Sequence, residues 1–138
     1  MKKAGAQLKA APSKSAKVSW RVPKYMPLQG TGKKKKQYVE VLDVDGRSHW
    51  AHESDLTKQW SCLVVKSKSA ALREGPGTEF QPARIPQVDK YTAFLDLGGE
   101  DGWALVELET GMQTWIDLER TWRPRTRIRM SFEPKSEK

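Results

Sequence analysis

The sequence predicts an all-β fold from three observations. Segments of five to seven residues with alternating or continuous apolar character follow one another, and ten glycines and eight prolines punctuate the chain. No helical period of apolar residues lasts beyond about one turn. Two segments 65 residues apart share a pattern of aromatic, valine, glycine and tryptophan positions, which indicates an internal repeat. Together these observations predict short strands joined by tight turns.

Residues 1–19 are rich in Lys, Ala and Ser, and Trp20 is the first aromatic residue of the chain. This composition, without apolar periodicity, predicts a flexible basic arm. The lysines at the start resemble the charged region of an export signal, but no apolar segment follows them. Two locations therefore stay open: the cytoplasm or, for a mature chain whose signal was removed, the periplasm or cell exterior.

The next segments predict a hairpin and a further strand. Residues 38–44 (YVEVLDV) alternate, and Asp45-Gly46 separates them from residues 47–52 (RSHWAH). An Asp-Gly dipeptide suits the positive φ angles of a two-residue hairpin turn. Residues 61–65 (SCLVV) are a compact apolar run, which predicts another strand.

The remaining segments predict four more strands. Residues 91–97 (YTAFLDL) and 103–109 (WALVELE) alternate around a glycine-rich break, and residues 112–118 (MQTWIDL) follow a Thr-Gly turn. Residues 125–132 (RTRIRMSF) alternate Arg with Thr, Ile, Met and Phe. They predict a closing or edge strand whose charges discourage unwanted pairing.

The internal repeat places one hairpin over another. At an offset of 65 residues, an aromatic residue opens the first strand of each hairpin, a glycine ends it, and a Trp follows four residues later. The matched pairs are Tyr38 with Trp103, Val41 with Val106, Gly46 with Gly111, and Trp50 with Trp115. The chain is therefore predicted to contain two copies of one hairpin.

Two motifs resemble the bacterial SH3-like (SH3b) family. Residues 71–80 (ALREGPGTEF) resemble its opening hairpin, and residues 98–119 (GGEDGWALVELETGMQTWIDLE) resemble its later half. The resemblance implies two tandem SH3-like small β-barrels behind the basic arm. The expected boundaries are 20–60 for a degenerate first copy, 61–124 for the second, and 125–138 for a basic C-terminal strand or tail.

The Gly-Pro-Gly segment is predicted to be a hairpin tip. Gly75 and Gly77 permit backbone conformations that other residues avoid, and Pro76 stiffens the turn. A phosphate-binding loop would need more glycines and a Lys-Ser/Thr pair that opens a helix. A nucleophile elbow would need a Ser between the glycines. The first copy shows YMPLQGTGKKKKQ (residues 25–37) in place of this loop.

No catalytic residue, cofactor site or metal site is predicted. Cys62 lies in an apolar strand, which favours a buried structural thiol over a nucleophile. His49 and His52 flank Trp50 on a strand, where positions i and i+3 face opposite sides, so we expect separate surface or edge histidines. The acidic pairs, Glu100 with Asp101 and Glu107 with Glu109, are expected on a solvated surface.

Six residues are candidates for ligand binding: Tyr38, Trp50, Arg73, Glu74, Trp103 and Trp115. For Trp50 and Trp115, packing within each barrel is favoured over a role as ligand platforms. Tyr38 and Trp103 stand at strand starts, and either role stays open for them. Arg73 and Glu74 form a surface pair or part of a recognition edge. Trp60 and Trp122 each follow the end of a copy and are expected to seal the boundary between the copies.

The net charge of +8 is unevenly distributed. Residues 1–36 carry eleven Lys and Arg and no acid, residues 37–120 have a net charge of −7, and residues 121–138 have +4. A nucleic-acid-binding domain would normally carry its positive charge on the folded surface, so this function is disfavoured. The run Lys33–Lys36 is expected to be a solvated loop tip, with contact to an anionic polymer as the alternative.

The SH3b resemblance implies a non-catalytic binding module at the bacterial cell envelope, exported or periplasmic, that recognises peptidoglycan, a wall peptide or a protein partner. Two other functions stay open: a nucleic-acid-binding SH3-like barrel and a purely structural or assembly protein. No stretch approaches the roughly 20 apolar residues that a transmembrane helix needs.

Overall fold

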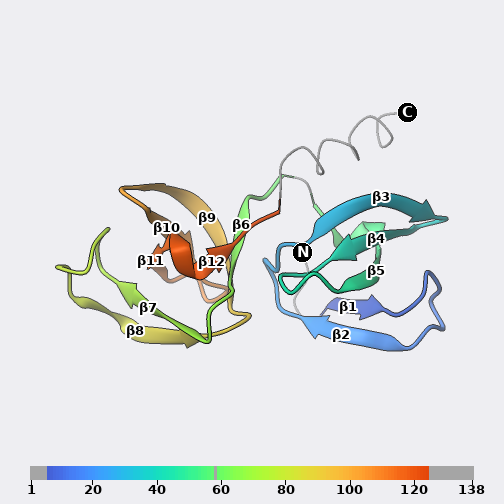
Figure 1. Ribbon diagram of the computed structural model, residues 1–138, viewed down its shortest axis with the longest axis horizontal. Coiled ribbons are helices and arrows are strands. Elements are labelled where there is room, and N and C mark those ends of the chain that lie inside the picture. The colour runs from blue at the N-terminus through green and yellow to red at the C-terminus, as the bar shows by residue number, and fades with distance from the viewer. Residues whose placement is uncertain (1–5, 58, 125–138) are drawn as a thin grey trace.

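The computed structural model describes residues 6–57 and 59–124. Its regular structure is almost entirely β, in two antiparallel sheets of five and seven strands, and neither sheet closes into a barrel within these residues. Figure 1 shows the two sheets next to each other along the long axis of the molecule. We refer to residues 6–57 as the first half and residues 59–124 as the second half. The predicted all-β class is confirmed.

The first sheet has the strand order β2-β1-β5-β4-β3. Strands β1, β4 and β5 alternate between buried and more exposed residues, as expected of a sheet with one face on a core. The 3₁₀-helix η1 follows the last of these strands along the chain. The elements are β1 (Ala6–Lys9), β2 (Val18–Val22), β3 (Gln29–Lys35), β4 (Tyr38–Leu42), β5 (Ser48–His52) and η1 (Glu53–Asp55).

The second sheet has the order β12-β6-β9-β10-β11-β7-β8. Its section β8-β7-β11-β10-β9 reproduces the order of the first sheet, and β6 and β12 extend it beyond β9. The elements are β6 (Cys62–Val65), β7 (Ser69–Arg73), β8 (Pro82–Asp89), β9 (Ala93–Glu100), β10 (Trp103–Glu107), β11 (Gln113–Asp117), η2 (Leu118–Arg120) and β12 (Thr121–Trp122).

The two halves correspond element by element at the predicted offset. Strands β4 and β10 begin and end 65 residues apart, as do β5 and β11, and η1 and η2. Each 3₁₀-helix is capped by the residue before it, since His52 accepts from the backbone N–H of Ser54 and Asp117 accepts from that of Glu119. Such caps satisfy amide groups that have no partner within the helix.

The turn between β4 and β5 differs from the prediction. The backbone N–H of Gly46 donates to Asp43 O, that of Asp43 donates to Arg47 O, and among these loop residues only Gly46 has a positive φ (82°). This is a three-residue loop with a left-handed glycine, not a two-residue turn. A two-residue turn with positive φ at both positions does occur, at Asp101 (54°) and Gly102 (81°) between β9 and β10.

The prediction of a flexible arm is wrong for residues 6–19. Strand β1 pairs with β2 on one side and with β5 on the other, and Ala6 and Leu8 are buried. Two apolar residues in a four-residue strand are too few to produce a visible period, which is why composition suggested an arm. The first half therefore does not begin at Trp20. Residues 1–5 lie outside the described residues, as do residues 125–138 with their predicted strand or tail.

The first half also contains the loop that it was expected to lack. Residues 10–17 join β1 to β2 as residues 74–81 join β7 to β8. The backbone N–H of Ala10 donates to Lys17 O, and that of Glu74 donates to Gln81 O, both at 2.9 Å. Inside each loop the backbone makes the same pattern of turn hydrogen bonds, and Pro12 occupies the position that Pro76 has in the second half. Ala11 and Ser13 replace the two glycines, which conceals the similarity in the sequence.

Two apolar clusters form the core, and β6 contributes to both. All four residues of β6 are buried. Cys62 and Val64 belong to the cluster of the first half, together with Leu8, Met26 and Val41. Leu63 and Val65 belong to the cluster of the second half, with Leu72, Phe94 and Ile116. Because successive side chains of a strand point to opposite faces, β6 separates the two cores and faces each of them.

Aromatic residues complete the boundary between the halves. Trp60 and Trp122 pack against the cluster of the first half, and the rings of Trp60 and Tyr25 meet edge to face at 5.2 Å. The expected role of the two tryptophans at this boundary is therefore confirmed.

No helix in the described part of the chain is long and apolar enough to cross a membrane.

Candidate functional site

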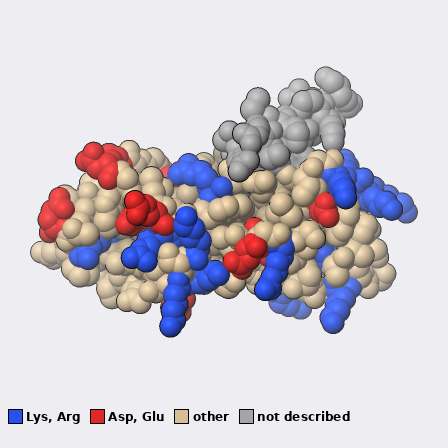
Figure 2. Space-filling view, viewed as in Figure 1, with Lys and Arg blue, Asp and Glu red and all other residues tan. Residues whose placement is uncertain are grey.

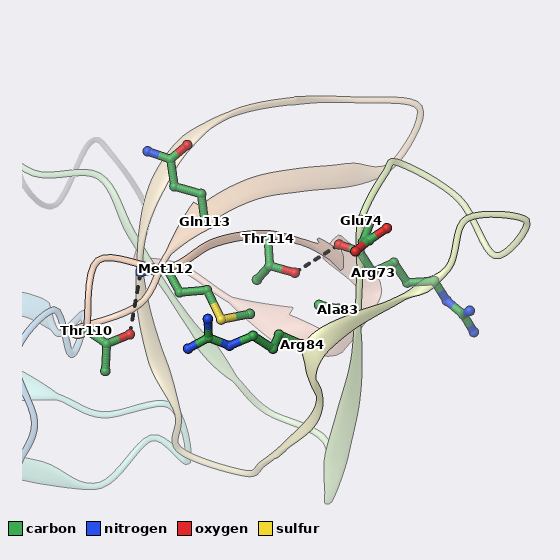
Figure 3. Close-up of a pocket in the computed structure, with 8 residues that line it drawn as sticks. All are labelled: Arg73, Glu74, Ala83, Arg84, Thr110, Met112, Gln113 and Thr114. Carbon is green, nitrogen blue, oxygen red and sulfur yellow. Dashed lines mark hydrogen bonds between the residues drawn. The ribbon is translucent and has the colours of Figure 1, made fainter.

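A pocket of about 430 Å³ opens in the second half beside the loop hairpin β7–β8 (Figure 3). This volume lies within the range of small-molecule and peptide side-chain sites. The loop hairpin supplies one wall and the β10–β11 turn the other. The lining residues are Arg73, Glu74, Ala83, Arg84, Thr110, Met112, Gln113 and Thr114.

Thr114 fixes the floor of the pocket. Its side chain is buried, and its hydroxyl donates to the carbonyl oxygen of Arg73 at 2.9 Å, which ties β11 to the end of β7. The guanidinium of Arg73 extends toward the loop in Figure 3, where Nη1 donates to Phe80 O at 3.1 Å. The Nε of Arg73 is buried and has no hydrogen-bond partner within the described chain. Arg73 therefore holds the loop against the sheet.

The pocket combines an apolar surface with two opposite charges. Met112 and Ala83 supply apolar surface, while the exposed Arg84 and Glu74 carry a positive and a negative charge. Figure 3 shows the side chains of Met112 and Arg84 pointing into the space between hairpin and turn. A guanidinium binds carboxylates through paired hydrogen bonds, and a carboxylate binds ammonium groups. The arrangement suits a small zwitterionic or peptide-like group.

An irregular pairing of β7 with β8 creates the space. Ala71 pairs with Gln87 and Arg73 with Pro82, so four residues of β8, 83–86, lie opposite Leu72 alone. In the first half the corresponding bulge contains one residue, and His49 occupies the position of Thr114. Bulges bend a strand and redirect its side chains. The sequence and pairing differences therefore distinguish this part of the second half from its counterpart.

The four aromatic candidates lie on the outer faces of the sheets. In β5 and β11 the residues on either side of each Trp are buried, and Trp50 and Trp115 themselves are half-buried and face outward. The favoured interpretation of these two residues as barrel packing is wrong for this reason. Tyr38 and Trp103 share these faces and are half-buried too.

The structure brings together only part of the predicted candidate set. Arg73 and Glu74 line the pocket, and Arg73 is the register partner of Trp115. Tyr38 and Trp50 lie in the other sheet. Sequence reasoning missed Arg84, Met112 and Thr114 as pocket residues. The alternation of residues 112–118 could have indicated an inward Thr114, but the two prolines around Arg84 concealed the course of β8.

The cysteine and histidine predictions have mixed outcomes. Cys62 is buried, as predicted, and burial raises the pKa of its thiol from the ordinary value of 9.0 to about 11. A thiol of this kind is a poor nucleophile at neutral pH. His49 and His52 do face opposite sides of β5, but His49 is buried, so the expectation of a surface histidine is wrong there. Residues 6–57 and 59–124 contain no group of His, Cys, Asp or Glu arranged to hold a metal ion.

No protein-family model matches this chain, and no curated protein matches it.

Proposed function

We propose that this protein is a non-catalytic binding module of two SH3-like units in tandem, exported to the bacterial cell envelope, where it binds a peptide of the cell wall or an extended segment of a protein partner. The pocket beside the loop hairpin carries the proposal. Its opposite charges, Arg84 and Glu74, stand at its exposed edge, and Met112 offers apolar contact. Wall peptides present carboxylate, ammonium and short apolar groups, which match these three features.

The charge of the half that contains the pocket supports a peptide over a nucleic acid, whereas the basic residues of the first half belong to its folded part. The first half carries ten Lys and Arg against five acids, and the second half seven against ten. Figure 2 shows positive and negative side chains interspersed over the face in view. A surface that follows a phosphate backbone would instead gather its positive charges into one stripe.

A pull-down on insoluble peptidoglycan tests the proposal. The full chain is incubated at low salt and at about 0.5 M salt, where electrostatic screening acts within a few Å. We expect binding that survives salt. Arg84→Ala should weaken it by about tenfold or more, because hydrogen bonds to a charged group contribute about 1.5–3 kcal/mol. Lys66→Ala is the matched control, since it removes an exposed cation of the same half that does not line the pocket.

Each of the other possible results of the pull-down excludes part of the proposal. Binding that disappears in salt would mean that only the lysine-rich segments contact the wall. Equal binding by both variants would place the site outside the pocket. If peptidoglycan does not bind, the same variants are used to capture a protein from an envelope extract, and failure there as well would overturn the proposed function.

A further inference from the structure

A chain of hydrogen bonds joins a serine, a histidine and an aspartate in the first half. The hydroxyl of Ser19 on β2 lies 2.7 Å from Nδ1 of His49 on β5. Nε2 of the same ring lies 2.8 Å from Oδ2 of Asp43, which follows β4. His49 and Asp43 are 7% and 4% exposed, whereas Ser19 is exposed to solvent. The second half does not repeat the chain, because Leu108 and Thr114 occupy the positions of Asp43 and His49.

The contacts of Asp43 determine where the protons lie. Its Oδ1 accepts from the backbone N–H groups of Asp45 (2.9 Å) and Arg47 (3.0 Å), and its Oδ2 faces His49. Because a carboxylate can only accept hydrogen bonds, Nε2 of the His49 ring carries a proton and donates a hydrogen bond to Asp43. In the neutral ring Nδ1 is then an acceptor, and the hydroxyl of Ser19 donates to it. A serine hydroxyl that donates to an imidazole held by a carboxylate is the arrangement of an activated nucleophile.

The local fold holds this arrangement at the protein surface. Leu8 pairs with Trp20 and Lys9 with Val18, so Ser19 is an extra residue in β2. A bulge of this kind redirects a side chain, and here it points the Ser19 hydroxyl at His49. The ring of Trp20 lies 5.9 Å from that of His49 and covers it on one side. The base is thus shielded, while Ser19 as a residue is exposed to solvent.

We propose that Ser19 is a reactive nucleophile that accepts an acyl or phosphonyl group from an activated electrophile. Oγ of Ser19 attacks the carbonyl carbon or phosphorus, and its proton passes to Nδ1 of His49. The bond to the leaving group then breaks, and the electron pair of that bond departs with the leaving group, which takes up a proton from His49 or from water. Asp43 is a positioning residue that fixes the ring and stabilises its charged form. The site is independent of the pocket in the second half.

The protein contains an internal control, which is a second serine–histidine pair that lacks an aspartate partner. The hydroxyl of Ser54 lies 2.7 Å from Nδ1 of His52, the same distance as in the Ser19 pair, and both serines are exposed. Within the described residues no carboxylate meets Nε2 of His52. A difference in reactivity between the two serines therefore measures the effect of the buried His49–Asp43 pair.

The experiment uses an alkyl fluorophosphonate as the electrophile, with fluoride as its leaving group. The full chain is incubated with the reagent, and the adducts at Ser19 and Ser54 are quantified over time by peptide mass spectrometry. We expect Ser19 to react at least about tenfold faster, since general-base assistance contributes about 10²- to 10⁴-fold. Equal rates at the two serines, or no adduct at Ser19, would overturn the proposal.

Two variants separate reactivity from structure. His49→Ala should abolish the adduct at Ser19, and added imidazole, which can enter the space left by the ring, should restore it. Asp43→Asn should slow the reaction at Ser19 by at least about tenfold and leave that at Ser54 unchanged. Tryptophan fluorescence checks that each variant is folded. If neither variant folds, the ratio of the two serines in the unmodified protein decides the question alone.

Discussion

At the scale of single residues, Asp45 connects the two halves. The hydroxyl of Tyr91 donates to its Oδ2 at 2.5 Å, and Nζ of Lys90 lies 3.0 Å from its Oδ1. The hydrogen bond from Tyr91 and then that from Lys90 lower the pKa of Asp45. A lowered pKa in the folded state stabilises the protein above the pKa of the unfolded chain, and this contribution disappears as the pH falls through the folded pKa.

Replacing Tyr91 by Phe should raise the pKa of Asp45 toward its ordinary value. The variant removes the largest cause of the shift and keeps a ring against Trp20, which Tyr91 meets edge to face at 5.2 Å. Carboxyl NMR during a pH titration measures the change. Because the contact is exposed, the loss in the free energy of unfolding at pH 7 should be small, and it should vanish in acid. Tyr38→Phe is the control, and an unchanged pKa would assign the shift to Lys90.

At the scale of elements, the two loop hairpins differ in one packing contact. A Cβ atom on Gly75 would overlap three carbons of the Phe80 ring. In the first half the corresponding residues are Ala11 and Ala16, so the loop with the same backbone hydrogen bonds contains neither glycine nor ring. The glycine at position 75 is therefore required by Phe80 and not by the turn itself.

The variant Gly75→Ala should destabilise the protein by roughly 1 kcal/mol, the lower end of the usual cost of overpacking, because the clashing Phe80 ring is 40% exposed and can turn partly away. In a Phe80→Ala background the same change should cost almost nothing, because the double variant reproduces the pair found in the first half. Urea unfolding of the four proteins of this cycle measures the coupling. Equal costs in both backgrounds would show that the backbone, and not the ring, selects glycine.

The same hairpins show how far the sequence predicts the elements. The β4–β5 and β10–β11 hairpins were predictable because both strands alternate and the turn glycines match. Strand β1 was not, since its only strongly apolar residue is Leu8 and its loop lacks the glycines of the second copy. The Arg-Glu pair of the pocket was suggested by its loop motif. Arg84 and Met112 were not, because their approach depends on an irregular strand register that local patterns do not encode.

At the scale of the whole molecule, the shared strand β6 should make the two halves unfold together. Leu63 faces the core of the second half and Val64 that of the first. Loss of either half would expose one side of a strand that is buried on both sides.

Leu63→Ala should destabilise both halves equally, by about 2–5 kcal/mol, because it leaves a cavity in a fully buried site. Fluorotryptophan NMR during urea unfolding reports on the halves separately, through Trp50 in the first and Trp115 in the second. We expect both signals to be lost at one urea concentration, which falls in the variant. The control Lys66→Ala changes an exposed residue next to β6, and it should leave the urea concentration of the transition unchanged. Separate transitions for the two tryptophans would contradict the prediction.

The position of β6 also bears on the ancestry of the chain. The matching strand orders suggest that one gene segment was duplicated, and duplicated segments are often lost or exchanged singly in later generations. Here the strand between the copies fills both cores, so a deletion that removed either copy would leave the other with an uncovered apolar face. Selection would then act on the pair as one heritable unit, and its descendants should keep both copies even where only one retains a pocket.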